Sequence, residues 1–321
     1  MKAIVRTLVV LALFSAGHAA AQGYPNRPVK IIVGSPAGQS VDVIARLLAQ
    51  PLAQSLGQPV IVDNRAGAGG VIGANALINA APDGYTTMIG SSGPLSIVPQ
   101  LQKVPFDSQK SFAPISLLAT LQYVLVTHPS FPAASPKELL TLVKANPGKY
   151  NFAGSGSGTT QHLAAELFKL RGGLDATFIP YAGSAATLAE VMSGRIDYAF
   201  ETMATALPLI QAGRIKALGV TSLKRSNKLP DVPTIAESTG LADFNVVAWI
   251  GLVARAGTPP EVSSKLAAEV QKALQGDDIR ERFIALGMDP ASSTPAELAR
   301  VMQEASERFG DIIKRANIKL E

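Results

Sequence analysis

The sequence contains no cysteine among its 321 residues. It therefore has no disulfide, no thiolate nucleophile and no cysteine ligand for a metal. Histidine is also scarce: outside the N-terminal segment there are only His128 and His162, far apart and with no cluster of possible ligands around them. We therefore expect neither a metal site nor any other bound cofactor.

The chain also lacks any run of basic residues. Its 29 Lys and Arg against 24 Asp and Glu give a net charge of +5, and the excess is scattered. We therefore expect no nucleic-acid partner. The composition, 47% hydrophobic and 17% charged, allows a substantial core in one large or two medium domains.

The long apolar run of a membrane span is missing from the N-terminus. Lys2 and Arg6 precede a short apolar stretch over residues 8–14, and three alanines end at Ala21. This pattern is typical of a secretory signal peptide, and the stretch is too short to span a bilayer. We expect residues 1–21 to be removed and the mature protein to be periplasmic.

What the chain does have is a regular alternation of apolar, β-rich runs and amphipathic helical stretches. This alternation predicts an α/β architecture with largely parallel sheets. The helices expected after successive strands span residues 41–56, 70–80, 93–102, 135–145, 159–170, 184–193 and 204–212.

The C-terminal part has a different pattern. Helices are expected over 259–275, 277–286 and 295–314 with no strands between them. Thr258 and Thr294, each followed by proline, are expected to cap two of these helices. Residues 222–240 lack periodicity and indicate a long loop with a short helix at most.

Two long apolar stretches in mid-chain, residues 116–126 and 245–257, are candidates for strands that cross between two lobes. They predict a hinge near residues 118–124 and 244–252. The expected division is lobe 1 over 22–122 plus 245–321, and lobe 2 over 123–244.

Small-residue turns follow several predicted strands. In parallel sheets ligands bind beyond the carboxyl ends of the strands, and helix N-termini attract anions. Ordinary turn formation, helix capping by serine or threonine, and an acid placed at a helix start would explain the same residues. The candidate ligand-binding residues are Gly38, Gln39, Ser40, Ala68, Gly69, Ser91, Ser92, Ser157, Thr159, Thr160, Tyr181 and Glu201.

Signatures of enzymes are missing. Ile72 stands where a dinucleotide-binding glycine motif needs its third glycine, and neither a P-loop nor a G-x-S-x-G elbow occurs. A nucleophile–base pair would have to use one of the two histidines. His162 follows Ser157 closely, but packing of a helix face explains it better.

The ordered segments "DVIARLLAQPLAQSLGQPVIVDNRAGAGGVIGA", "AAPDGYTTMIGSSG", "IPYAGSAATLAEVMSGRIDYAFET" and "IKALGVTSLKRSNKLPDVPTIAES" cover much of the chain. In these segments the sequence resembles the periplasmic solute-binding receptors of tripartite tricarboxylate transport systems, the Bug receptors. The resemblance implies a two-lobe Venus-flytrap fold of type II-like topology with two crossing strands. It further implies a monomer that is not an enzyme and that passes a small carboxylate to membrane transporter subunits.

The resemblance also implies a division of the site. Turns 35–42 and 64–70 of the first lobe would hold one ligand carboxylate through backbone groups and waters, and second-lobe turns would contact the remainder. Two positions depart from the family pattern: Gln39 stands where a glycine is usual, and Glu201 where an aspartate is usual. A periplasmic sensor subunit, and a secreted α/β hydrolase or lyase using His162 or Glu201, remain as alternatives.

Overall fold

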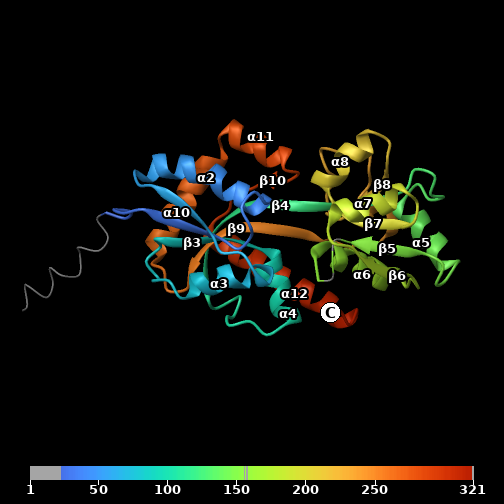
Figure 1. The fold of residues 1–321 in the computed structure, drawn as a ribbon, viewed down its shortest axis with the longest axis horizontal. Coiled ribbons are helices and arrows are strands. Elements are labelled where there is room, and N and C mark those ends of the chain that lie inside the picture. The colour runs from blue at the N-terminus through green and yellow to red at the C-terminus, as the bar shows by residue number, and fades with distance from the viewer. Residues whose placement is uncertain (1–22, 155, 157, 320–321) are drawn as a thin grey trace, which may run out of the picture.

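The computed structural model describes residues 23–154, 156 and 158–319. The expected signal peptide and the candidate Ser157 lie outside these residues. Two α/β lobes lie side by side along the long axis and are joined by strands β4 (Phe112–Thr127) and β9 (Val247–Arg255) (Figure 1). No helix in the described part of the chain is long and apolar enough to cross a membrane.

Lobe 1 is built on the strand order β2-β1-β3-β9-β4. The first three strands are parallel, and β9 runs antiparallel to β3 and β4. Their bounds are β1 (Val29–Val33), β2 (Val60–Asn64) and β3 (Thr86–Ser91). Because β1 to β3 are parallel, the turns that follow them gather at one edge of the sheet, facing lobe 2 (Figure 1).

Helices cover both faces of this sheet. One core packs around α2 (Ser40–Leu56), α10 (Pro260–Leu274) and α11 (Asp277–Ala285). The helices of the other face belong to a second core, which continues into lobe 2. They are the short turn η1 (Ala68–Gly70) leading into α3 (Val71–Ile78), the π-turn η2 (Gly93–Ile97) leading into α4 (Val98–Leu101), and the long α12 (Pro295–Arg315).

Lobe 2 repeats the arrangement with the strand order β6-β5-β7-β4-β8. Its strands are β5 (Asn151–Gly154), β6 (Thr177–Pro180), β7 (Tyr198–Thr202) and β8 (Lys216–Val220). Its helices are α5 (Pro136–Lys144), α6 (Thr160–Gly172), α7 (Ser184–Met192), α8 (Met203–Gln211) and the short α9 (Ile235–Thr239) inside the expected long loop. The α/β class and the crossing strands predicted from the sequence are thus confirmed.

Two details of the C-terminal part differ from the prediction. A two-residue strand, β10 (Asp289–Pro290), pairs with β4 between the helices, where no strand was expected. Thr258 does not cap α10: its hydroxyl donates to the carbonyl of Arg255, and Pro259 takes the cap position. Thr294 does cap α12, in a reciprocal capping box with Glu297.

Candidate functional site

A pocket of about 530 Å³ lies at the carboxyl ends of β1, β2 and β3. Its walls come from the three turns that follow these strands. The described lining residues are Gly34, Ser35, Pro36, Gln39, Val41, Ala66, Gly67, Gly69, Gly70, Met88, Ile89, Ser91 and Pro94. Gln39, Gly69 and Ser91 are the predicted residues that line it. Gly38, Ser40 and Ala68 belong to the same turns without being part of the described lining.

A larger hollow of about 740 Å³ lies elsewhere, on the outer surface of lobe 1 between α2, α10 and α11. Its walls include the acidic side chains of Glu269, Asp277 and Asp278. It is remote from the strand ends, and its three acids outnumber the one lysine in its described lining, Lys272, so it would repel an anion. We therefore regard the smaller pocket as the candidate site.

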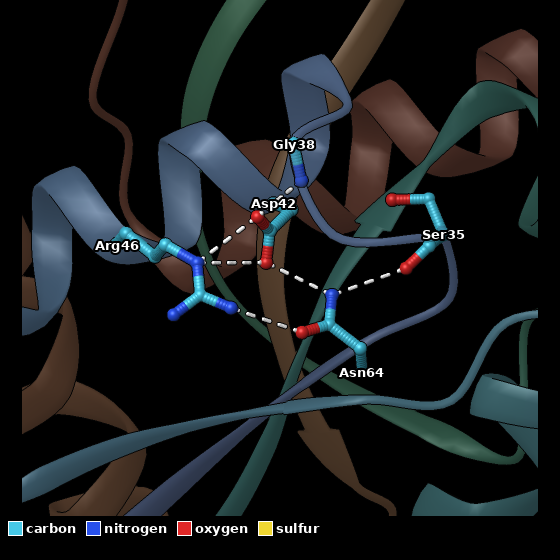
Figure 2. A network of polar contacts seen from close by, with 5 residues as sticks. All are labelled: Ser35, Gly38, Asp42, Arg46 and Asn64. Carbon is cyan, nitrogen blue, oxygen red and sulfur yellow. Dashed lines mark hydrogen bonds and ion pairs between the residues drawn. The ribbon is translucent and has the colours of Figure 1, made fainter.

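The first turn is held by a buried carboxylate, Asp42, on the first turn of α2 (Figure 2). Asp42 is 1% exposed and accepts hydrogen bonds from the Gly38 N–H at 2.8 Å, from Asn64 Nδ2 at 2.9 Å and from Arg46 Nε at 3.0 Å. Asn64 also donates to the carbonyl of Ser35 at 3.1 Å. The N–H of Gly38 is therefore committed to Asp42, and the network ties the first turn to the end of β2.

The pKa of Asp42 reflects this network. Burial by itself would raise the pKa, but the hydrogen bonds from Arg46, Gly38 and Asn64, together with the charge of Arg46, lower it to about 2. Asp42 is therefore ionised at neutral pH, and its charge is already satisfied by the protein.

The start of α2 carries the donors that the site needs. Gln39 occupies the N-cap position, but no side chain caps the helix, so the first-turn N–H groups lack an acceptor within the helix. The partial positive charge of a helix start attracts an anion. The Gln39 side chain is exposed at the pocket wall and is free of any capping role.

The second turn has an unusual backbone. Gly67, Ala68, Gly69 and Gly70 all have positive φ, at 128°, 48°, 63° and 93°. A non-glycine residue such as Ala68 rarely adopts this conformation, and such strain is concentrated at functional sites. A Cβ on Gly70 would lie 2.9 Å from Pro94, so this glycine brings the second and third turns together.

No cationic side chain completes the pocket. Arg65 precedes the second turn, but its side chain is exposed and pairs with Asp63 at 3.1 Å. Neither lysine nor arginine occurs among the described lining residues. In the described chain, likewise, no group of His, Asp and Glu side chains could hold a metal ion. An anion in this pocket would be held by backbone donors and neutral side chains.

The two serines of the third turn differ. Ser91 lines the pocket, whereas Ser92 is 1% exposed and its Oγ accepts the backbone N–H of Trp249 at 2.9 Å. Trp249 Nε1 also donates to Ser96 Oγ at 3.3 Å. Ser92 therefore anchors the crossing strand β9 to the third turn, and Trp249 is buried on that strand.

The predicted residues of lobe 2 surround the start of α6. Thr159 caps this helix by accepting the His162 N–H at 3.2 Å. Thr160 lies near the Tyr123 hydroxyl: burial raises the pKa of Tyr123 to about 12, and the Thr160 side chain acts in the opposite direction. Tyr181 is half-buried in the turn after β6, and Glu201 on β7 is fully buried. None of the four is part of the described lining of the lobe 1 pocket.

The His162 side chain is packed against its neighbours and is not positioned as a catalytic base. Its ring stacks on Phe178 with centroids 3.9 Å apart, and its Nδ1 accepts the Gly158 N–H at 3.0 Å. Its Nε2 lies 3.8 Å from Glu166, and the histidine is only 6% exposed. These contacts agree with the helix-packing interpretation of the sequence.

The sequence reasoning missed Asp42, Asn64 and Arg46. Each looks ordinary on its own: an acid in the first turn of a helix, an asparagine at a strand end and an exposed arginine. The spacing of Asp42 and Arg46 gave the signal for an i,i+4 pair, but nothing local shows that Asn64 joins them.

The family model described as "Tripartite tricarboxylate transporter family receptor" matches residues 44–318. BugT of Bordetella pertussis is 37% identical over 325 residues, covering 99% of both chains. R. palustris Rpa4515, solved with adipate, is 31% identical with a TM-score of 0.76, covering 93% of this chain and 100% of its own. MatC from Rhodopseudomonas palustris, solved with malate, is 32% identical with a TM-score of 0.72, covering 90% and 100%.

These likenesses extend over nearly the whole chain and both lobes. They identify the two-lobe architecture as that of solute-binding receptors and agree with the absence of enzyme motifs in the sequence. On the family match and on its near full-length likeness to BugT, the chain belongs to the tripartite tricarboxylate transporter receptor family.

Proposed function

We propose that this chain captures a small organic carboxylate between its lobes and presents it to the membrane subunits of a transporter. The observation that carries the proposal is the pocket at the ends of β1 to β3. It has the uncapped start of α2 in its wall and no cation in its described lining. Such a site suits a carboxylate held by N–H groups.

One carboxylate would lie against lobe 1. The N–H groups of residues 40–42 have no acceptor within the helix, and the turn at residues 67–70 adds backbone that can approach closely. Bridging waters can be nearly as favourable in enthalpy as direct hydrogen bonds, so the absence of an ion pair does not make the site weak.

The rest of the ligand would contact lobe 2 after closure about residues 118–124 and 244–252. We assign this role to the turns that carry Ser157, Thr159, Thr160, Tyr181 and Glu201. Glu201 is fully buried in this structure, so its contact with ligand would require its side chain to turn out toward the cleft. The lobes would be residues 22–122 plus 245–321, and residues 123–244.

Two relatives support one class of ligand. Adipate and malate, found in two of the solved relatives, are both aliphatic dicarboxylates. We propose an aliphatic dicarboxylate for this chain, with acidic amino acids and aromatic acids as the competing classes.

A thermal-shift screen of these three classes, followed by calorimetry on each hit, tests the proposal. A ligand at one hundred times its dissociation constant should stabilise the protein by about 2.7 kcal/mol. Mass spectrometry should recover the ligand unchanged. The proposal is wrong if no carboxylate shifts the melting temperature and native mass spectrometry finds none bound.

We also propose that the protein is exported as a monomer and cleaved after Ala21. The basic, apolar and alanine-rich order of residues 1–21 supports this. N-terminal sequencing of protein from a periplasmic extract should begin at Gln22, whereas intact Met1 protein in the membrane fraction would refute it.

A further inference from the structure

The crossing strands β4 and β9 have one face directed toward the candidate site and one directed away from it. Gln122 on β4 pairs with Val247 on β9, so these side chains share a face. Tyr123, the next residue, points to the opposite face, where its hydroxyl meets Thr160 at the start of α6. Because Thr160 belongs to the lobe 2 turns that we propose contact the ligand, the face that carries Gln122 lies behind the cleft.

On this rear face, Gln122 connects elements of both lobes. Its Nε2 donates to Asp289 Oδ2 at 2.7 Å, and Asp289 belongs to β10 of lobe 1. Its Oε1 lies 3.1 Å from the hydroxyl of Ser222, in the loop that follows β8 in lobe 2. The single proton of this hydroxyl is shared with the carbonyl of Lys224, at 2.6 Å in the same loop. The loop is therefore fixed across the back of the hinge.

The same loop reaches lobe 1 directly through Lys228. Its Nζ donates to the carbonyl of Ile284, in the last turn of α11, at 2.9 Å. Burial lowers the pKa of Lys228 below its ordinary value, although the charge of Asp289 acts in the opposite direction. This ammonium group is thus held between the lobes.

The corner between α11 and β10 also touches α8 of lobe 2. A Cβ on Gly287 would lie 2.3 Å from the Cβ of Ala204 and 2.5 Å from its backbone nitrogen. The two lobes are therefore in close contact beside the rear face. The pocket of the candidate site is different, because its described lining comes from lobe 1 alone.

We propose that the contacts of Gln122 with Ser222 and Asp289, and of Lys228 with Ile284, form a rear brace that opposes closure and so limits ligand affinity. The proposal rests on the proposed function, because closure around a carboxylate is the motion that the brace would oppose. Rotating the lobes together in front of β4 and β9 moves their rear surfaces apart. Ligand binding must offset the breaking of these rear hydrogen bonds, so a weaker brace gives tighter binding.

Lys228→Met tests the brace, because methionine removes the donor and keeps an apolar side chain. Lys224→Met is the matched control: it makes the same charge change in the same loop, and the Lys224 side chain has no hydrogen bond or ion pair to other described residues. Calorimetry with adipate as the probe should give about five-fold tighter binding for Lys228→Met, or ~1 kcal/mol, and no change for the control. Unchanged or weaker binding in Lys228→Met would overturn the proposal.

A second measurement needs no ligand. The chain lacks cysteine, so Ile72→Cys, at an exposed position of lobe 1, can carry a single nitroxide label. Rarely populated closed forms bring the label close to lobe 2 and broaden the NMR signals of nearby amides, such as that of Ala182. This broadening should be stronger in Lys228→Met than in Lys224→Met. Equal broadening in the two variants would refute the brace.

The calorimetry and the label experiment test the proposed function and the rear brace separately. If the wild-type protein binds no carboxylate, the proposed function fails while the label experiment still decides the brace. If Lys228→Met does not fold, Gln122→Met removes the contacts with Ser222 and Asp289 instead. It should show stronger broadening of the lobe 2 signals than Lys224→Met does. Equal broadening in Gln122→Met and Lys224→Met would count equally against the brace.

Discussion

The two lobes present their site turns in different ways. In lobe 1 the first turn is fixed by the buried Asp42 network, and a Cβ on Gly73 would lie 2.9 Å from the Cα of Gly34. In lobe 2 a Cβ on Gly183 would meet no described atom within 4 Å. The Thr159 hydroxyl bonds only locally, to the carbonyl of Gly156 in its own turn and to the N–H of His162 in its own helix. The turns of lobe 1 are thus tied to one another by hydrogen bonds and close backbone contacts, whereas the turn at Gly183 in lobe 2 has open space around it.

This difference predicts different roles for the two lobes in ligand binding. A rigid, preformed set of donors loses little entropy on binding and suits the group that all ligands of the proposed class share, the carboxylate. Turns with open space can accommodate different ligand bodies. We therefore expect substitutions in lobe 1 to affect binding of every ligand, and those in lobe 2 to change which ligand is preferred.

The largest expected effect is on Gly69→Val. Gly69 has φ 63° and lines the pocket, and a Cβ there would lie 3.3 Å from Val98 Cγ2. A β-branched side chain is therefore strained there and displaces the turn that forms the pocket wall. Calorimetry should show a loss on the order of 100-fold, or ~2.7 kcal/mol, in carboxylate affinity.

Gly213→Val in lobe 2 is the control for strain. Gly213 has φ 65°, and a Cβ at this position would meet no described atom within 4 Å. Valine there therefore costs similar backbone strain, about 1–3 kcal/mol, without touching the pocket. The variant should bind ligand normally. Normal binding by Gly69→Val would place the site elsewhere.

Asp42→Ala should destabilise lobe 1 by about 2–3 kcal/mol, because the Gly38 N–H and the Asn64 amide lose their acceptor. Arg46 adds little, since its side chain is 54% exposed and remains hydrated. Chemical denaturation measures the loss. Glu190→Ala, which breaks the pair with the exposed Arg195 in lobe 2, should cause no measurable change in stability. Equal losses would contradict the contrast between the lobes.

The low pKa of Asp42 predicts that the stability of the protein depends on pH. The folded-state pKa of Asp42 is about 2, below its ordinary value of 3.8, so its contribution to stability is complete above about pH 5. It is lost as the pH falls through about 2, and it amounts to about 2 kcal/mol. The stability difference between wild type and Asp42→Asn should therefore shrink between about pH 5 and about pH 2. A difference that stays constant would show that Asp42 is not ionised in the folded protein.

Much of the architecture could be predicted because it depends on periodicity. Alternating apolar runs indicated the strands, and the lengths of the stretches at 116–126 and 245–257 indicated the crossings that became β4 and β9. The strand β10 could not be found this way, because its two residues are a strand only through their pairing with β4.

The candidate site could be predicted only in outline. Turns after parallel strands must gather at one edge, and this placed residues 35–42 beside 64–70. The sequence does not show that Asn64 bonds to both Asp42 and Ser35, or that Gly34 lies against Gly70 and Gly73. Those contacts join residues whose chemistry is ordinary and whose meeting depends on the packing of α2 and α3 on the sheet.

The smallest expected effect separates the backbone of the first turn from its one distinctive side chain. Gln39 stands where the family usually has glycine, lines the pocket and caps nothing, and its φ of −76° does not require glycine. Its amide can both donate to and accept from a ligand. Gln39→Ala should therefore cost on the order of 1 kcal/mol of binding, about five-fold in affinity, and leave the melting temperature unchanged. Calorimetry with a dicarboxylate and with the matching monocarboxylate would show whether the amide contacts the shared carboxylate or the far end of the ligand. An equal loss for both indicates the shared carboxylate, and a loss for the dicarboxylate alone indicates the far end. If neither affinity changes, Gln39 only fills the turn, and the lobe 1 site depends on its backbone alone.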